Sequence, residues 1–101
     1  MPMFEITIVP LGTNSPSLSR YVKVSYGEIK RSGLKFQLTP MGTCIIGDFK
    51  EVFSLVERIH EKFARMGIDR ISTQIKIDDR RDKEITFESK IQAVKGREKK
   101  R

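Results

Sequence analysis

Two amphipathic helical segments alternate with four strand-like segments in the order β-α-β-β-α-β, and this order constrains the fold more than any other feature. The second helical segment, residues 48–67, is the clearest. Asp48 precedes Glu51 by three positions, close to the capping-box pattern that begins helices, and Gly67 suits the turn that ends one. Its apolar residues recur at helical spacing and form one stripe: Val52, Val56, Ile59, Phe63 and Met66. We therefore predict an amphipathic helix here.

The first half of the chain shows the same strand-then-helix pattern. Residues 3–10 alternate apolar and polar side chains, as a half-buried strand does. Ser15 and Pro16 indicate a helix start, because serine caps helices and proline fits the first helical position. Gly33 suits the left-handed position after the last turn. The positions at helical spacing between them are Leu18, Val22, Ser25 or Tyr26, and Ile29.

Three more strands follow, over residues 35–39, 43–47 and 70–77, with a hairpin corner at Pro40-Met41-Gly42. Right-handed crossovers fold this order into a ferredoxin-like α+β domain, with a four-stranded antiparallel sheet and two helices on one face. Beyond the fourth strand, residues 86–95 fit either a helix or a strand. We favour a short C-terminal helix, with Thr86 as cap and an apolar stripe of Phe87, Ile91 and Val94.

One face of this sheet has no helices. The pleat places mostly uncharged side chains there: Thr7, Val9, Gln37, Thr39, Gln74 and Lys76. Ferredoxin-like subunits commonly use such a face, or their edge strands, for self-association or ligand binding. We therefore expect a homo-oligomer.

Length and charge set further bounds. The 101 residues fit a single domain, which we place at residues 1–94, followed by a basic tail at residues 95–101. The tail carries +4 of the formal net charge of +7, so the domain keeps an ordinary +3. A basic terminal run is typically solvated, so we expect no nucleic-acid partner. One cysteine, no membrane-length apolar run and no signal-peptide pattern favour a cytoplasmic protein without a membrane partner.

The sequence lacks the residues that several common kinds of functional site need. The chain has one histidine, His60 in the apolar stripe, and one cysteine, Cys44 in a short apolar strand, too few for a zinc site or a catalytic triad. It has no phosphate-binding glycine loop. Residues 12–17 lack the arginine of an acylphosphatase-type site, and residues 43–47 lack the aromatics that stack RNA bases. We expect no catalytic residue, metal or cofactor, which leaves a small-molecule pocket or a purely structural assembly.

Two motifs remain. Pro-Leu-Gly-Thr at residues 10–13 returns as Pro-Met-Gly-Thr at residues 40–43. Each copy is either a turn or a corner that offers a hydroxyl and free amides to a shared pocket. Residues 78–83 form a dense cluster of alternating charge. It is either a solvated turn or a network in which Asp78 and Arg80 meet at a subunit contact or a pocket rim, near Lys76.

Taken together, five segments resemble the small thiamine-binding-protein family: residues 8–22, 33–43, 60–61, 70–83 and 89–94. The resemblance spans nearly the whole chain, from Ile6 to about Val94. It implies a ferredoxin-like fold, assembly into dimers and tetramers through the sheets, and binding of thiamine or its hydroxymethyl-aminopyrimidine half. It implies no catalysis.

The residues suit such a ligand. Thr13, Ser17 and Thr43 supply hydroxyls, while Tyr21, Phe36 and Met41 can cover a flat ring. Where the family usually has Thr-x-Ile-Glu-Gly after the second corner, this chain has Ile46 at the acidic position, leaving Asp48 as a less well-placed substitute. We therefore predict a preference for the neutral pyrimidine over cationic thiamine, and we expect Ile46→Glu to shift that preference toward the cation. A nucleic-acid-associated protein and a scaffold without a ligand are the alternatives.

Overall fold

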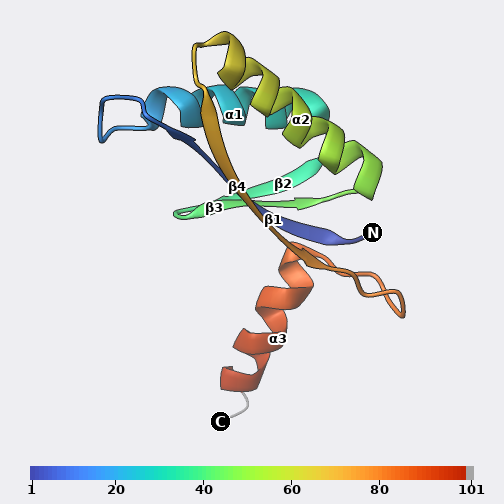
Figure 1. Ribbon diagram of the computed structural model, residues 1–101. Coiled ribbons are helices and arrows are strands. Elements are labelled where there is room, and N and C mark those ends of the chain that lie inside the picture. Colours follow the sequence, from blue (N-terminus) through green and yellow to red (C-terminus); the bar gives the residue numbers. More distant parts are fainter. Residues whose placement is uncertain (100–101) are drawn as a thin grey trace.

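The computed structural model describes the backbone of residues 1–99 and the side chains of residues 1–96. Its elements are β1 (Met3–Leu11), α1 (Ser19–Ser32), β2 (Lys35–Thr39), β3 (Gly42–Ile46), α2 (Phe49–Arg65), β4 (Arg70–Asp78) and α3 (Phe87–Lys99). The four strands form one antiparallel sheet in the order β2-β3-β1-β4, and α1 and α2 lie on one of its faces (Figure 1). The predicted ferredoxin-like α+β fold and its C-terminal helix are confirmed.

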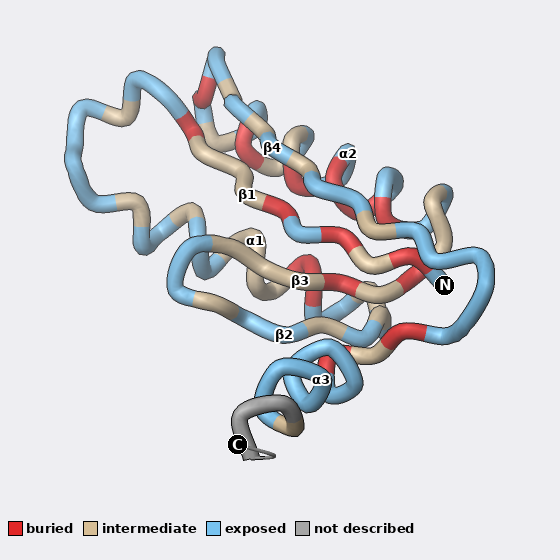
Figure 2. Tube along the Cα trace, turned by 90° about the horizontal axis from the view of Figure 1, so that it is seen from below, coloured by how far each residue is buried: buried red, intermediate tan, exposed pale blue. Residues whose placement is uncertain are grey.

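The strand register separates the two faces of the sheet. Phe4 pairs with Ile45 and Ile6 with Thr43, and these side chains face the helices. Figure 2 shows most buried positions along β1, β3 and α2, with others next to α3. The core consists of Phe4, Ile6, Ile29, Ile45, Val52, Leu55, Val56, Ile59, Phe63 and Ile68. Each such side chain stabilises the fold by roughly 1.5–3 kcal/mol relative to an exposed one.

Helix α2 supplies half of that core and begins and ends almost where the sequence predicts. The Asp48 side chain accepts a hydrogen bond of 2.7 Å from the Glu51 backbone N–H, and this bond lowers the pKa of Asp48. Gly67, after the helix, has a φ of 90°. Leu55, absent from the predicted stripe, is fully buried with it. His60 is half-buried, and its Nε2 lies 2.6 Å from the Thr73 hydroxyl.

The prediction that α1 starts at Ser15-Pro16 is wrong, because the helix begins at Ser19. The Ser15 hydroxyl instead accepts a hydrogen bond from the Ser17 N–H, and its carbonyl accepts one from the Thr13 hydroxyl. Asn14 lies in the left-handed region, with a φ of 60°. These local hydrogen bonds stabilise the segment as a turn, and the turn competes with helix formation.

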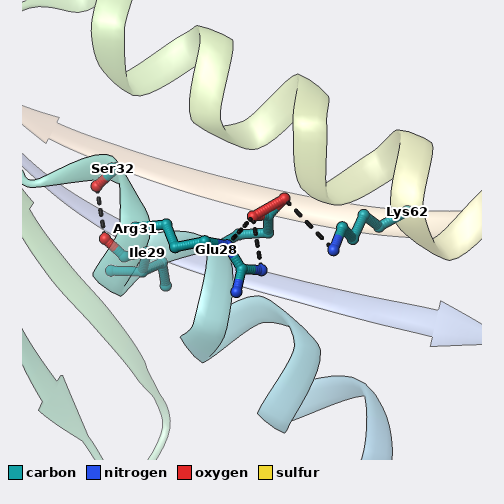
Figure 3. Close-up of polar contacts among 5 residues, drawn as sticks. All are labelled: Glu28, Ile29, Arg31, Ser32 and Lys62. Atoms are coloured by element: carbon teal, nitrogen blue, oxygen red, sulfur yellow. Dashed lines mark hydrogen bonds and ion pairs between the residues drawn. The ribbon is translucent and has the colours of Figure 1, made fainter.

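A buried carboxylate joins α1 to α2 (Figure 3). Glu28 is 8% exposed and accepts hydrogen bonds of 3.2 and 3.0 Å from Arg31, while its second oxygen lies 3.8 Å from Lys62 Nζ on α2. A buried charge is tolerated only when it is paired. The Glu28–Arg31–Lys62 cluster therefore links the two helices across their contact.

Helix α3 starts on the opposite face of the sheet and then extends away from it (Figures 1 and 2). Thr86 and Ser89 exchange backbone-to-hydroxyl hydrogen bonds, as predicted for a cap at Thr86. Lys35 on β2 pairs with Glu88, and Asp78 on β4 pairs with Lys90, so the first turn of α3 is tied to both edges of the sheet. The helix runs to Lys99, so the proposed tail of residues 95–101 begins inside it, and residues 100–101 lie outside the described residues.

Candidate functional site

A cavity of about 480 Å³ lies between α1 and the part of the sheet nearest the β2–β3 hairpin. It exists because α1 covers the sheet less completely than α2 does. Five α2 side chains are buried, whereas α1 buries only Glu28 and Ile29. Val22, in the apolar stripe of α1, remains 59% exposed and lines the cavity.

The cavity is mainly apolar, with a few polar groups at defined places. Its floor consists of core residues from β1, β3 and α2, among them Ile6, Ile45 and Ile59. Its polar lining residues are Thr7, Lys23, Ser25, Tyr26, Thr39 and Thr43. Apolar walls with a few fixed polar groups are typical of small-molecule sites, and the volume lies within their usual range of roughly 300–1,000 Å³.

Two of these hydroxyls donate hydrogen bonds to the backbone of the β2–β3 hairpin, and two others have no side-chain hydrogen bond among the described residues. The Thr39 hydroxyl donates to the Gly42 carbonyl at 2.9 Å, and the Thr7 hydroxyl donates to the Met41 carbonyl at 3.2 Å. The hydroxyls of Ser25 and Thr43 make no side-chain hydrogen bond to any residue that the structure describes. They are therefore available to a ligand.

The end of β3 exposes a row of backbone groups beside the cavity. Pairing between β1 and β3 stops at Ile6–Thr43, while β1 continues to Leu11 against β4. In an antiparallel strand, alternate backbone N–H and C=O groups point to each side, so those of Thr7–Val9 that point toward β3 have no strand partner there. Thr7, Ile8 and Val9 all line the cavity. Fixed donors and acceptors at a free strand edge suit the edge of a heteroaromatic ring.

The two similar motifs have different structural roles. Gly12 adopts a φ of 75°, the left-handed conformation of a turn. Gly42 has no positive φ, but a Cβ at this position would lie 2.9 Å from the Ile6 carbonyl oxygen and 2.9 Å from the Thr7 hydroxyl. The second motif therefore brings the hairpin close to β1 and forms one end of the cavity, while the first is the turn before α1.

The structure brings only two of the predicted ligand residues, Met41 and Thr43, into this cavity. The hydroxyls of Thr13 and Ser17 bond locally to Ser15 and Ser19, and neither residue lines the cavity that Thr43 lines. Tyr21 contacts the edge of Phe63, and Phe36 contacts the edge of Tyr26, at ring centroid distances of 5.5 and 5.9 Å. Neither Tyr21 nor Phe36 lines the cavity, although Phe36 packs against Tyr26, which does.

The remaining predicted residues lie on other surfaces. Ile46 pairs with Met3 on the sheet face away from Thr43, and Lys76 pairs with Glu5 on that same face. Asp48 and Arg80 share a second, charged hollow of about 530 Å³ beside the loop of residues 79–84. Asp78 and Arg80 form no joint network, because Asp78 pairs with Lys90 and Arg80 with Asp82.

The second hollow is a weaker candidate, because most of its charged groups already pair with one another or cap a helix. Arg80 holds Asp82 through two hydrogen bonds and lowers the pKa of that carboxyl to about 2. Arg81 pairs with Asp79, and Asp48 caps α2. The cavity under α1 instead contains free hydroxyls and apolar walls.

Sequence reasoning missed the contribution of α1 to the cavity. Lys23 and Ser25 of α1, and also Leu38 of β2, line the cavity but are not among the predicted site residues. The stripe of Leu18, Val22 and Tyr26 was visible in the sequence. The signal that α1 would be poorly covered is its polar composition, since its stripe includes a serine where α2 has a large apolar residue.

The single cysteine and the single histidine of the chain lie outside the cavity. Cys44 is half-buried on the face of the sheet away from α1, and burial, followed by the nearby charge of Glu5, raises the pKa of its thiol. His60 contacts Thr73 of β4. None of the described residues that line the cavity is a histidine, cysteine or carboxylate.

The comparison with known proteins agrees with this architecture. The sequence profile described as "Thiamine-binding protein" matches residues 4–95. The chain belongs to this family. One family relative, the UPF0045 protein YqgV of Bacillus subtilis, is 44% identical over 98 residues, which are 93% of this chain and 94% of the relative. The UPF0045 protein ECM15 of Eremothecium gossypii is 39% identical over 92 residues, covering 91% and 88% of the two chains.

Solved structures show the same fold. The hypothetical protein MJ1052 of Methanocaldococcus jannaschii superposes with a TM-score of 0.84 at 35% identity, covering 93% of this chain and 95% of that one. A Thermotoga maritima protein, described as a candidate thiamine biosynthesis or salvage protein, has a TM-score of 0.76 at 22% identity, over 92% of this chain and 97% of that one. Within residues 1–99, no helix combines the length and apolarity needed to cross a membrane.

Proposed function

We propose that this protein is a non-enzymatic binder of thiamine or its hydroxymethyl-aminopyrimidine half, and that the cavity between α1 and the sheet is the binding site. The observation that carries the proposal is the composition of this cavity, in a chain of the thiamine-binding family. Apolar walls enclose it, the Pro40–Thr43 corner forms one end, and the hydroxyls of Ser25 and Thr43 are free. No histidine, cysteine or carboxylate lies among its described lining residues.

A flat aminopyrimidine matches these groups. The Tyr26 ring and the Met41 side chain provide apolar cover, and Met41, at 84% exposed, can close over a bound ring. The Thr43 and Ser25 hydroxyls and the free edge of β1 provide donors and acceptors for the ring nitrogens and the amino group. The preference for the neutral pyrimidine now rests on the absence of a carboxylate from the described lining, and not on Ile46, which lies on the other face of the sheet.

A pair of matched threonine variants tests the site. Isothermal titration with the free pyrimidine and with thiamine should show that Thr43→Val weakens binding by about 1–3 kcal/mol, because a ligand group loses its partner in a partly buried place. Thr13→Val removes the same hydroxyl from the other motif copy, outside the cavity, and should leave affinity unchanged. Equal affinity of all three proteins would contradict the assignment of this cavity.

We also propose that the protein acts as a homodimer or homotetramer in the cytoplasm. β4 is a nine-residue edge strand without proline. Antiparallel pairing with β4 of a second copy about Gln74 places Arg70 opposite Asp78 and Ile71 opposite Ile77. Opposite charges and apolar pairs across strands favour such a register. Light scattering that showed only an 11.7 kDa species at micromolar concentration would contradict the proposal.

A further inference from the structure

Lys23 is the one charged side chain among the described residues that line the cavity. Every other lining residue is apolar or neutral. Side chains three and four positions away on a helix are its neighbours, and for Lys23 these are Ser19, Arg20, Tyr26 and Gly27. None is acidic, so α1 provides no counter-charge for the lysine.

The single acidic residue of α1 is engaged elsewhere. Glu28 is buried, and its two oxygens interact with Arg31 and with Lys62 of α2 (Figure 3). A second cation lies close to the cavity wall, because Lys30 Nζ is 5.6 Å from the centre of the Tyr26 ring. Lys23, Tyr26 and Lys30 follow one another at helical spacing, so they share one side of α1. This side of the cavity is positively charged.

We infer that the natural ligand of this cavity carries an anionic group, and specifically that it is a flat heteroaromatic ring bearing a phosphate monoester, which Lys23 binds. The inference rests on the proposed function, because both place the ring of the ligand in the apolar interior of the cavity. The hydroxymethyl substituent of the pyrimidine is where such an ester is attached. A lysine ammonium is a compact point charge that binds phosphate through charge-assisted hydrogen bonds. The same charge opposes a cationic ring.

Calorimetric titrations with three ligands test this inference: hydroxymethyl-aminopyrimidine, its phosphate monoester and thiamine. In the wild-type protein at low salt, the ester should bind about five- to tenfold more tightly than the neutral pyrimidine. Lys23→Met keeps the apolar stem of the side chain and should abolish that difference without weakening the neutral ring. Lys50→Met, an exposed lysine on α2 that does not line the cavity, is the matched control and should keep the difference. High salt should reduce the advantage of the ester.

The outcomes separate this inference from the proposed function. If the neutral ring binds but the ester binds no more tightly, or if Lys23→Met keeps the advantage of the ester, the inference is overturned while the binding function stands. If the ring, the ester and thiamine all fail to bind, the proposed function fails and the inference fails with it. Both lysine variants should fold normally, because both positions are exposed, and circular dichroism checks this.

Discussion

Replacing Gly42 by alanine tests the close approach that forms one end of the cavity. The added Cβ would lie 2.9 Å from the Ile6 carbonyl oxygen, whereas ordinary van der Waals contact begins near 3.4 Å, so the strands must separate by about 0.5 Å. The Ile6 carbonyl belongs to β1 inside the sheet and cannot rotate away. The Thr7 hydroxyl, also at 2.9 Å, can rotate, but it then loses its hydrogen bond to Met41.

Three contributions determine how much Gly42→Ala changes the free energy of unfolding. Overpacking costs about 1–3 kcal/mol, and a lost hydrogen bond costs about 0.5–1.5 kcal/mol. The alanine also restricts the unfolded chain, which offsets about 0.4–1 kcal/mol. We therefore expect Gly42→Ala to lower the free energy of unfolding by about 1–3 kcal/mol, and to weaken ligand binding because the hairpin moves away from β1.

Urea denaturation followed by circular dichroism measures the effect as a lower midpoint with an unchanged slope. Gly96→Ala is the control, because a Cβ at that position in α3 meets no atom within 4 Å and alanine favours helices. The control should be neutral or slightly stabilising. If Gly42→Ala unfolds at the wild-type urea concentration and binds ligand equally well, the hairpin does not approach β1 as described.

Three further predictions concern other parts of the molecule. Asp48→Ala should lower the urea midpoint at neutral pH. The pKa of Asp48 is lower in the folded protein than in the unfolded chain, so its carboxylate stabilises the fold at pH values above the unfolded pKa near 4. This stabilisation is lost as the pH falls through the folded pKa, so the stabilities of mutant and wild type should converge in acid. Ile46→Glu should leave the ratio of thiamine to pyrimidine affinity unchanged in calorimetry, since Ile46 lies across the sheet from the cavity, and a shift toward thiamine would place the ligand on that face. Arg70→Glu should weaken self-association in light scattering while Arg81→Glu does not, and equal masses for both would argue against pairing through β4.

The sequence predicts most of the fold because its local signals agree with each other. The apolar stripe of α2 and its cap at Asp48 both predict a helix, and the alternating residues of β4 predict a strand. The folded structure contains the helix, the cap and the strand. The start of α1 is the exception. Ser15 and Pro16 carry a valid helix-start signal, yet the hydroxyls of Thr13 and Ser15 bond locally and form a turn. Competition between two local hydrogen-bond patterns cannot be decided from residue types alone.

The candidate site depends on the tertiary structure. Alone, the sequence determined the order of elements, the two faces of the sheet and the presence of both Gly-Thr corners, because these follow from side-chain period and turn chemistry. It could not determine that only the second corner lines the cavity, since that depends on β3 stopping opposite Ile6 while β1 continues to Leu11. Nor could it show that α1 leaves a cavity, because a cavity arises from how two surfaces fit and not from either surface alone. Lys23 became a candidate only when the fold placed it in the lining of the same cavity as Thr43 and the hairpin.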